Sequence, residues 1–189
     1  SFGQKETKQY NFTISGSGIS IEKLKAISNL LGGSCTLVDK TEEFKDFVLK
    51  PCMTASLSLR TKNSFILCHK VKFEALEEVA DRIGASFIST GHYAKVQENK
   101  SNGVISILTG NDLKNDQSGH LAGVPERIHH RLILPLGDLQ EKEVLRIAEK
   151  NKFDSFATDQ ENSKTCITED EFFKEYVDAY FPESLKKDG

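Results

Sequence analysis

Two cysteines, Cys68 and Cys166, lie far apart in the sequence, yet each has a lysine two residues away, Lys70 and Lys164 respectively. A nearby positive charge favours the thiolate, which is the nucleophilic form of cysteine. These settings predict reactive thiols that could exchange sulfur if the two side chains meet in space. The alternative for each is a small, buried and chemically inert side chain.

The spacing of the cysteines limits the other uses of sulfur. The four cysteines include no C-x-x-C pair and have no regular spacing, which argues against a disulfide scaffold and against a structural zinc site. Cys35 and Cys52 occupy apolar positions of the pattern and are predicted to belong to the core.

A second group of polar residues follows a predicted buried strand at residues 86–89. Thr90, Gly91 and His92 come directly after it, and open α/β sheets bind their ligands at the carboxyl ends of strands. The pattern therefore predicts that His92 borders a ligand pocket. The alternative is a loop histidine with satisfied hydrogen bonds.

Two segments could bind phosphate. Arg127, His129, His130 and Arg131 form a basic cluster, interpreted either as a phosphate contact or as a solvated loop. Residues 15–18, Ser-Gly-Ser-Gly, form a turn whose backbone N–H groups could hold phosphate, or a plain turn. The net charge of −3 means that any site for a polyanion must be a local patch.

Composition excludes a membrane protein. The chain has 189 residues, of which 38% are hydrophobic and 28% charged, enough for one ordinary core. Its apolar runs fall short of the ~18 residues that a membrane helix needs, and no signal peptide is recognisable. These features predict a soluble, intracellular protein without a membrane partner.

The positions of apolar residues predict alternating helices and strands in the first half of the chain. Strands are expected at 11–14 and 36–38, and helices at 21–31, at 42–49 with an end at Pro51, and at 71–83 with an end at Gly84. Residues 52–64 lack a clear period and are predicted to form a loop.

The second half adds a hairpin. Segments 93–98 and 104–108 alternate around Asn102-Gly103, a strong hairpin signal. Residues 132–136 are predicted to form a strand. Capping-box patterns at Asp138 and at Thr168 predict helices at 139–150 and 169–180, the second of which would begin just after Cys166. The fold class predicted is α/β, Rossmann-like, with a parallel sheet and a β-hairpin insertion.

From about Leu31 to Pro182, the order of short motifs resembles the tRNA-specific 2-thiouridylases, relatives of the PP-loop ATP pyrophosphatases. In chain order the motifs are Glu42-Glu43-Phe44-Lys45, Ile66-Leu67-Cys68 with Lys72-Phe73, Ala85 with Thr90-Gly91-His92-Tyr93-Ala94, Asp116-Gln117-Ser118, Leu134-Pro135-Leu136-Gly137-Asp138-Leu139, and Cys166. Their combined order and spacing are far more specific than any one of them.

The resemblance implies an adenine nucleotide alpha hydrolase fold and ATP-dependent sulfur transfer to C2 of the wobble uridine of tRNA, with ATP and Mg²⁺ as cofactors. Cys166 would carry a persulfide, and Cys68 would release the sulfur by closing a disulfide. The residues implied at the nucleotide are Thr90, Gly91 and His92, and those implied at the tRNA are Asp116, Gln117, Ser118, Arg127 and Arg131. No protein metal ligands are implied.

The implied partners are tRNA and a sulfur-donor protein, either a persulfide relay or a cysteine desulfurase. The implied location is the cytoplasm, with an organelle of bacterial origin as the alternative. Residues 1–167 would form a catalytic domain that lacks its amino-terminal part, and residues 168–189 the start of a second, tRNA-binding domain.

The chain departs from the family pattern at several points. The Ser-Gly-Gly-x-Asp-Ser pyrophosphate loop is not recognisable, and neither is the carboxy-terminal β-barrel. Phe65 replaces a usual Asp or Cys, and Gly119-His120 replaces an aromatic pair. These departures leave a second hypothesis open, namely a degenerate relative that binds nucleotide or RNA without catalysing a reaction.

Overall fold

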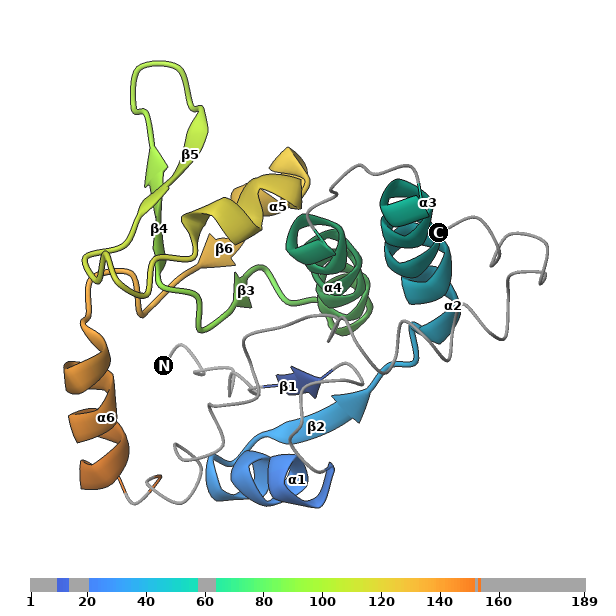
Figure 1. The fold of residues 1–189 in the computed structure, drawn as a ribbon. Coiled ribbons are helices and arrows are strands. Elements are labelled where there is room, and N and C mark those ends of the chain that lie inside the picture. Colours follow the sequence, from blue (N-terminus) through green and yellow to red (C-terminus); the bar gives the residue numbers. More distant parts are fainter. Residues whose placement is uncertain (1–9, 14–20, 58–63, 152, 154–189) are drawn as a thin grey trace.

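The computed structural model describes residues 10–13, 21–57, 64–151 and 153 (Figure 1). Its first unit is β1 (Tyr10–Thr13), α1 (Ile21–Leu30) and β2 (Ser34–Leu37). The two strands are parallel, with Tyr10 opposite Ser34. Gly32, two residues after the last residue of the helix, adopts a φ of 68°, which favours glycine. The strand–helix–strand order predicted for this segment is confirmed.

The helical segment after β2 does not end where proline predicts. It runs through α2 (Thr41–Phe44), a π-helical turn η1 (Lys45–Leu49) and α3 (Lys50–Leu57). Proline lacks an N–H and its ring crowds the preceding turn of an α-helix. Here that turn is widened, and the Lys50 N–H donates to the Lys45 carbonyl. The wide turn carries the helix past Pro51, so the predicted end at Pro51 and the predicted loop from residue 52 were wrong.

Helix α4 (Ser64–Ile83) is longer than the predicted helix at 71–83. Its carboxyl end at Gly84, where φ is 69°, is as predicted. The additional turns place Cys68 and His69 within the helix, and both are buried. Phe73, Val79 and Ala80, predicted to lie on its apolar face, are also buried.

The second half of the chain contains the strands nearest to the candidate site. β3 (Ile88–Ser89) pairs in parallel with β6 (Leu132–Ile133). β4 (Ala94–Glu98) and β5 (Ile105–Thr109) form the predicted antiparallel hairpin, which projects from the body (Figure 1). Gly103 in its turn has a φ of 71°, as expected for an Asn-Gly turn.

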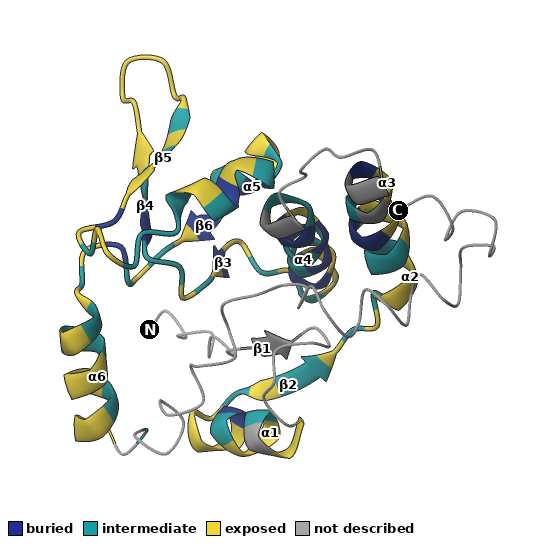
Figure 2. Ribbon diagram, viewed as in Figure 1, coloured by how far each residue is buried: buried dark blue, intermediate teal, exposed yellow. Residues whose placement is uncertain are grey.

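Two short helices cover β3 and β6, the 3₁₀ helix η2 (Ser118–Gly123) and α5 (Glu126–His129). The main core joins α4, both strands and these helices; its buried members are Phe73, Ala80, Ile88, Ala94, Leu121, Val124, Ile128 and Leu132. Buried residues gather on these elements, whereas the hairpin tip and α6 (Glu141–Lys150) have none (Figure 2).

The start of α6 corrects one detail of the sequence analysis. The capping box joins Gln140 and Glu143, two residues after the predicted pair at Asp138 and Glu141. Asp138 instead pairs with Lys95 at 3.0 Å. The Glu141 N–H is satisfied by the Asp112 carboxylate at 2.9 Å. A side chain from a distant loop therefore caps a position that local sequence assigned to Asp138.

The described strands form three pairs, of which two are parallel and one is the hairpin. Together with the helices that connect them, they confirm the Rossmann-like α/β class. Within the described residues, no helix is both long and apolar enough to span a membrane. The predicted helix at 169–180 and the predicted domain boundary after residue 167 lie outside the described residues.

Candidate active site

The candidate site lies where β3 and β6 end. Because the two strands are parallel, the segments that follow them leave the same edge of the pair. The Thr90 N–H donates to the Ile133 carbonyl at 3.2 Å and continues the ladder by one residue. Gly91 is exposed, and a Cβ added there would meet only Leu136, at 3.7 Å. Thr90 and Gly91 thus lie at the open strand end where the sequence predicts ligand binding.

His92 is fixed by hydrogen bonds at both ring nitrogens. Its Nδ1 lies 2.9 Å from the Thr90 hydroxyl. Its Nε2 lies 2.8 Å from Nε2 of His69, on α4. The second contact connects the strand end directly to the helix that carries Cys68.

Aromatic rings surround this contact. The rings of His69 and His92 meet edge to face with centroids 4.9 Å apart, and Phe73 lies 5.8 Å from His92. His120, on η2, lies 5.5 Å from His69. Three imidazoles from separate elements, together with Phe73, therefore form a single cluster, which we call the histidine cluster (His69, Phe73, His92 and His120).

The pKa of His92 is lowered from 6.5 to about 3, chiefly by burial and also by the basic side chains of His69, His120 and Lys72. Burial also lowers the pKa of Lys72. His92 is consequently a neutral imidazole at physiological pH, able to donate one hydrogen bond and accept one.

Cys68 precedes His69 on α4 and is 1% exposed. It packs with Val48 and Val71 in a second, smaller core cluster. Cys35 and Cys52 lie on other elements, β2 and α3; they are not in disulfides and are only partly buried. Cys68 is disulfide-bonded. Cys166 lies outside the described residues, so its pairing with Cys68 stays a prediction.

Asp116, Gln117 and Ser118 hold their own loop against the hairpin. Asp116 accepts hydrogen bonds from the Gly110 N–H at 3.0 Å and from the Ser118 hydroxyl at 2.8 Å. Gln117 bonds twice to the backbone of Tyr93, through its side-chain oxygen and its own N–H. These contacts place the loop beside the segment that follows His92. Contact with a target base stays a prediction.

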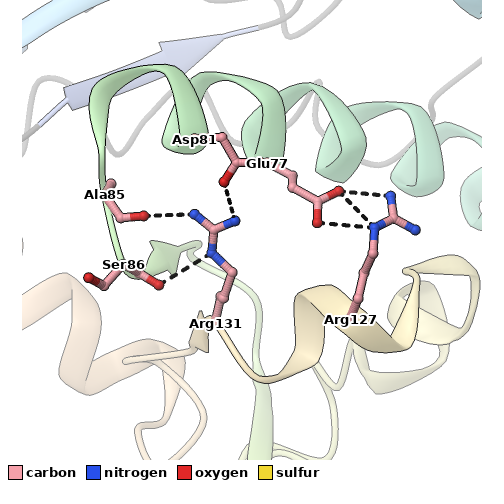
Figure 3. A network of polar contacts seen from close by, with 6 residues as sticks. All are labelled: Glu77, Asp81, Ala85, Ser86, Arg127 and Arg131. Carbon is pink, nitrogen blue, oxygen red and sulfur yellow. Dashed lines mark hydrogen bonds and ion pairs between the residues drawn. The ribbon is translucent and has the colours of Figure 1, made fainter.

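Arg127 and Arg131, predicted to bind tRNA phosphates, are both engaged within the protein (Figure 3). Arg127 forms a two-pronged ion pair with Glu77, with distances of 2.8 to 3.1 Å. Arg131 pairs with Asp81 at 2.6 Å and donates to the carbonyls of Ala85 and Ser86. Both arginines connect the α5 region to α4, and their binding of tRNA phosphates stays a prediction.

Sequence reasoning did not identify His69 and His120 as site residues. The signal for His69 was available, because His69 and Phe73 are four residues apart and share one face of a helix. The predicted helix began at residue 71, however, and so excluded His69. His120 carried no local signal, since only the packing of η2 against α4 brings it close.

Among the described residues, no group of three or more His, Cys, Asp or Glu side chains is placed to hold a metal ion.

Similarity to known proteins agrees with this geometry. A family model described as tRNA methyl transferase HUP domain matches residues 3–170. A tRNA-specific 2-thiouridylase MnmA of Amoebophilus asiaticus is 32% identical over 159 residues, which are 84% of this chain and 42% of that protein. The MnmA 2 protein of Syntrophus aciditrophicus is 30% identical over 169 residues, 89% of this chain and 49% of that protein.

A third relative, the MnmA protein of Staphylococcus saprophyticus, is 32% identical over 158 residues, 83% of this chain and 42% of that protein. This chain thus spans somewhat less than half the length of these relatives. The chain belongs to the tRNA methyl transferase HUP domain family, and its predicted kinship with the tRNA-specific 2-thiouridylases is confirmed.

Proposed function

We propose that this chain is the nucleotide-binding and sulfur-transferring part of a tRNA 2-thiouridylase. The observation that carries the proposal is the hydrogen bond between His69 and His92. It joins the helix bearing Cys68 to the strand end where an α/β protein of this class binds its ligand. A sulfur-releasing thiol and an activating nucleotide must serve the same uracil carbon, and this arrangement supports that requirement.

The residues at the strand end suit part of a bound nucleotide. Gly91 leaves room beside its backbone, and Thr90 and His92 are fixed in place. ATP would supply adenylation of the uracil oxygen at C2, which makes that oxygen a leaving group. The predicted phosphate turn at residues 15–18 lies outside the described residues. Mg²⁺ would bind together with the nucleotide, coordinated by its phosphates, as is common for this ion.

The proposed thiol chemistry uses two cysteines. The terminal sulfur of a persulfide on Cys166 attacks C2, and AMP leaves. The Cys68 thiolate then attacks the Cys166 sulfur, so that a disulfide forms and 2-thiouridine is released. A thiol reductant reopens the disulfide, and a sulfur-donor protein reloads Cys166. Asp116, Gln117, Ser118, Arg127 and Arg131 are the proposed tRNA contacts.

The alternative is a relative that binds nucleotide or RNA without turnover. It is favoured by Phe65, which stands where the family pattern has an acid or a third cysteine, and by the burial of Cys68 in an apolar cluster. The two functions differ in whether the thiols are required.

An activity assay distinguishes the two. Purified protein is incubated with a tRNA transcript, ATP, Mg²⁺, cysteine and a cysteine desulfurase, and 2-thiouridine is measured by mass spectrometry after digestion. We expect the parent chain to form 2-thiouridine, and Cys68→Ser and Cys166→Ser to abolish it. Cys35→Ser is the matched control and should retain activity, because Cys35 lies on β2 away from the candidate site.

Peptide mapping after mild oxidation tests the pairing independently of turnover. We expect a cross-link between Cys68 and Cys166 in preference to one at Cys35 or Cys52. Binding of ATP or tRNA without thiolation by the parent chain would support the non-catalytic alternative. Equal cross-linking of all four cysteines would refute the assigned thiol pair.

A further inference from the structure

We propose that His69 is a positioning residue for His92, whose imidazole it holds in one tautomer and one orientation at the strand end. The inference rests on the proposed function, in which His92 borders the nucleotide. It adds a residue from α4, outside the strand-end motif, to the machinery of that site.

The geometry is a clamp from two elements. Thr90 contacts Nδ1 of His92 from the strand end, and His69 contacts Nε2 from α4. A ring with a hydrogen bond at each nitrogen cannot rotate about its Cβ–Cγ bond without breaking both. Phe73, whose ring centroid lies 5.8 Å from that of His92, flanks the clamped ring.

The contact between two Nε2 atoms also restricts protonation. At 2.8 Å, one nitrogen must donate and the other must accept, because two N–H groups cannot point at each other. The pair therefore shares a single proton along this line. Protonation of both rings would place two N–H groups against each other and break the bond.

The surroundings keep the His92 ring of this pair neutral. The titratable groups acting on His92 are His69 and Lys72 from α4 and His120 from η2, all of them basic. Asp116, beside η2, acts on His120. Burial of His92 among basic groups keeps its ring neutral, so its Nε2 is free to accept the proton that His69 offers.

This arrangement changes what His92 can do for a nucleotide. Both of its nitrogens are already used within the protein, so it has no ring hydrogen bond to spare for a ligand. The imidazole of His92 would instead be a rigid packing surface that holds the exposed backbone of Gly91 in place. Loss of His69 should therefore weaken nucleotide binding through loss of order at the strand end.

The test uses the full chain and nuclear magnetic resonance of its imidazoles, with His69→Ala, His69→Gln and the control His130→Ala. His130 is exposed and directly follows α5. Long-range ¹H–¹⁵N spectra report the tautomer and protonation of each ring. In the parent and in His130→Ala we expect His92 to be a single neutral tautomer, titrating near pH 3.

In His69→Ala we expect mixed tautomers and a His92 pKa raised toward 6.5, because water and one fewer basic neighbour favour the charged ring. His69→Gln should restore a single tautomer, since its amide can donate to Nε2. The His69→Gln variant also keeps the test valid if the alanine variant does not fold. Calorimetry with ATP should show affinity at least severalfold weaker in His69→Ala and largely recovered in His69→Gln.

An unchanged His92 tautomer in folded His69→Ala would overturn the proposal. If the tautomer becomes mixed while ATP affinity is unchanged, the clamp stands and the nucleotide role of His92 fails instead. If the parent chain does not bind ATP, that result counts against the proposed function. The clamp is still tested in that case, because the spectra are recorded without any ligand.

Discussion

Replacing Gly137 by alanine should destabilise the protein, although alanine is usually the better residue for folded backbone. Gly137 is buried between the end of β6 and the start of β4. A Cβ at this position would lie 2.2 Å from the carbonyl oxygen of Ala94 and 2.9 Å from its carbonyl carbon. Since the clashing atoms are backbone, no side-chain rotation relieves the contact.

The size of the effect follows from two opposing terms. Overpacking that forces backbone shifts typically costs about 1–3 kcal/mol. Alanine also makes the unfolded chain less flexible than glycine does, which raises the free energy of unfolding by about 0.4–1 kcal/mol. The shift would also strain the hydrogen bonds of Gly137, which donates to Leu134 and accepts from Asn111. We therefore expect a net loss of about 1–2 kcal/mol, or a fall in Tm of roughly 2–8 °C for a chain of this size.

Thermal and urea unfolding, followed by circular dichroism, measure this loss. The matched control is Gly119→Ala, because a Cβ at Gly119 has no atom within 4 Å and its φ is not positive. That variant should unfold within about 0.5 kcal/mol of the parent. If Gly137→Ala proves as stable as Gly119→Ala, the close approach of β4 to the β6 segment is not as the structure has it.

Two further predictions concern charge. The pKa of His92 is lowered from 6.5 to about 3, so between these values only the unfolded chain takes up the proton. The stability that His92 contributes is thus complete above pH 6.5 and lost as pH falls toward 3; His92→Gln should flatten this dependence in urea unfolding from pH 7 to 4. For Arg127 and Arg131, tRNA affinity should fall by about 0.7–0.9 log units per log unit of salt for each phosphate contact. Reversing the charge of both arginines should lower that slope. An unchanged slope would mean that Arg127 and Arg131 do not contact tRNA phosphates and serve only in their ion pairs with Glu77 and Asp81.

The sequence analysis was correct for elements that short stretches of sequence determine, such as the hairpin and the carboxyl end of α4. The Asn102-Gly103 turn and the alternation on either side of it define the hairpin, and Gly103 takes the expected positive φ. Gly84 ends α4 for the same reason. The order of strands and helices, and with it the fold class, required only these signals and the apolar periods.

Prediction failed where distant residues decide the outcome. Pro51 normally ends a helix, but the π turn before it and the packing of Val48 beside Cys68 keep the chain helical. The amino-terminal turns of α4, residues 64–70, were missed because the predicted helix began only at residue 71. The histidine cluster was missed as a consequence, since His69, His92 and His120 come from three elements that only tertiary packing brings together.

The departures from the family pattern acquire a structural meaning at this cluster. Where the pattern has an aromatic pair after Asp-Gln-Ser, this chain has Gly119-His120, and the ring of His120 still lies 5.5 Å from that of His69. An imidazole retains a flat ring for packing but adds a titratable group beside His92. His120 therefore adds a basic neighbour that contributes to the lowered pKa of His92.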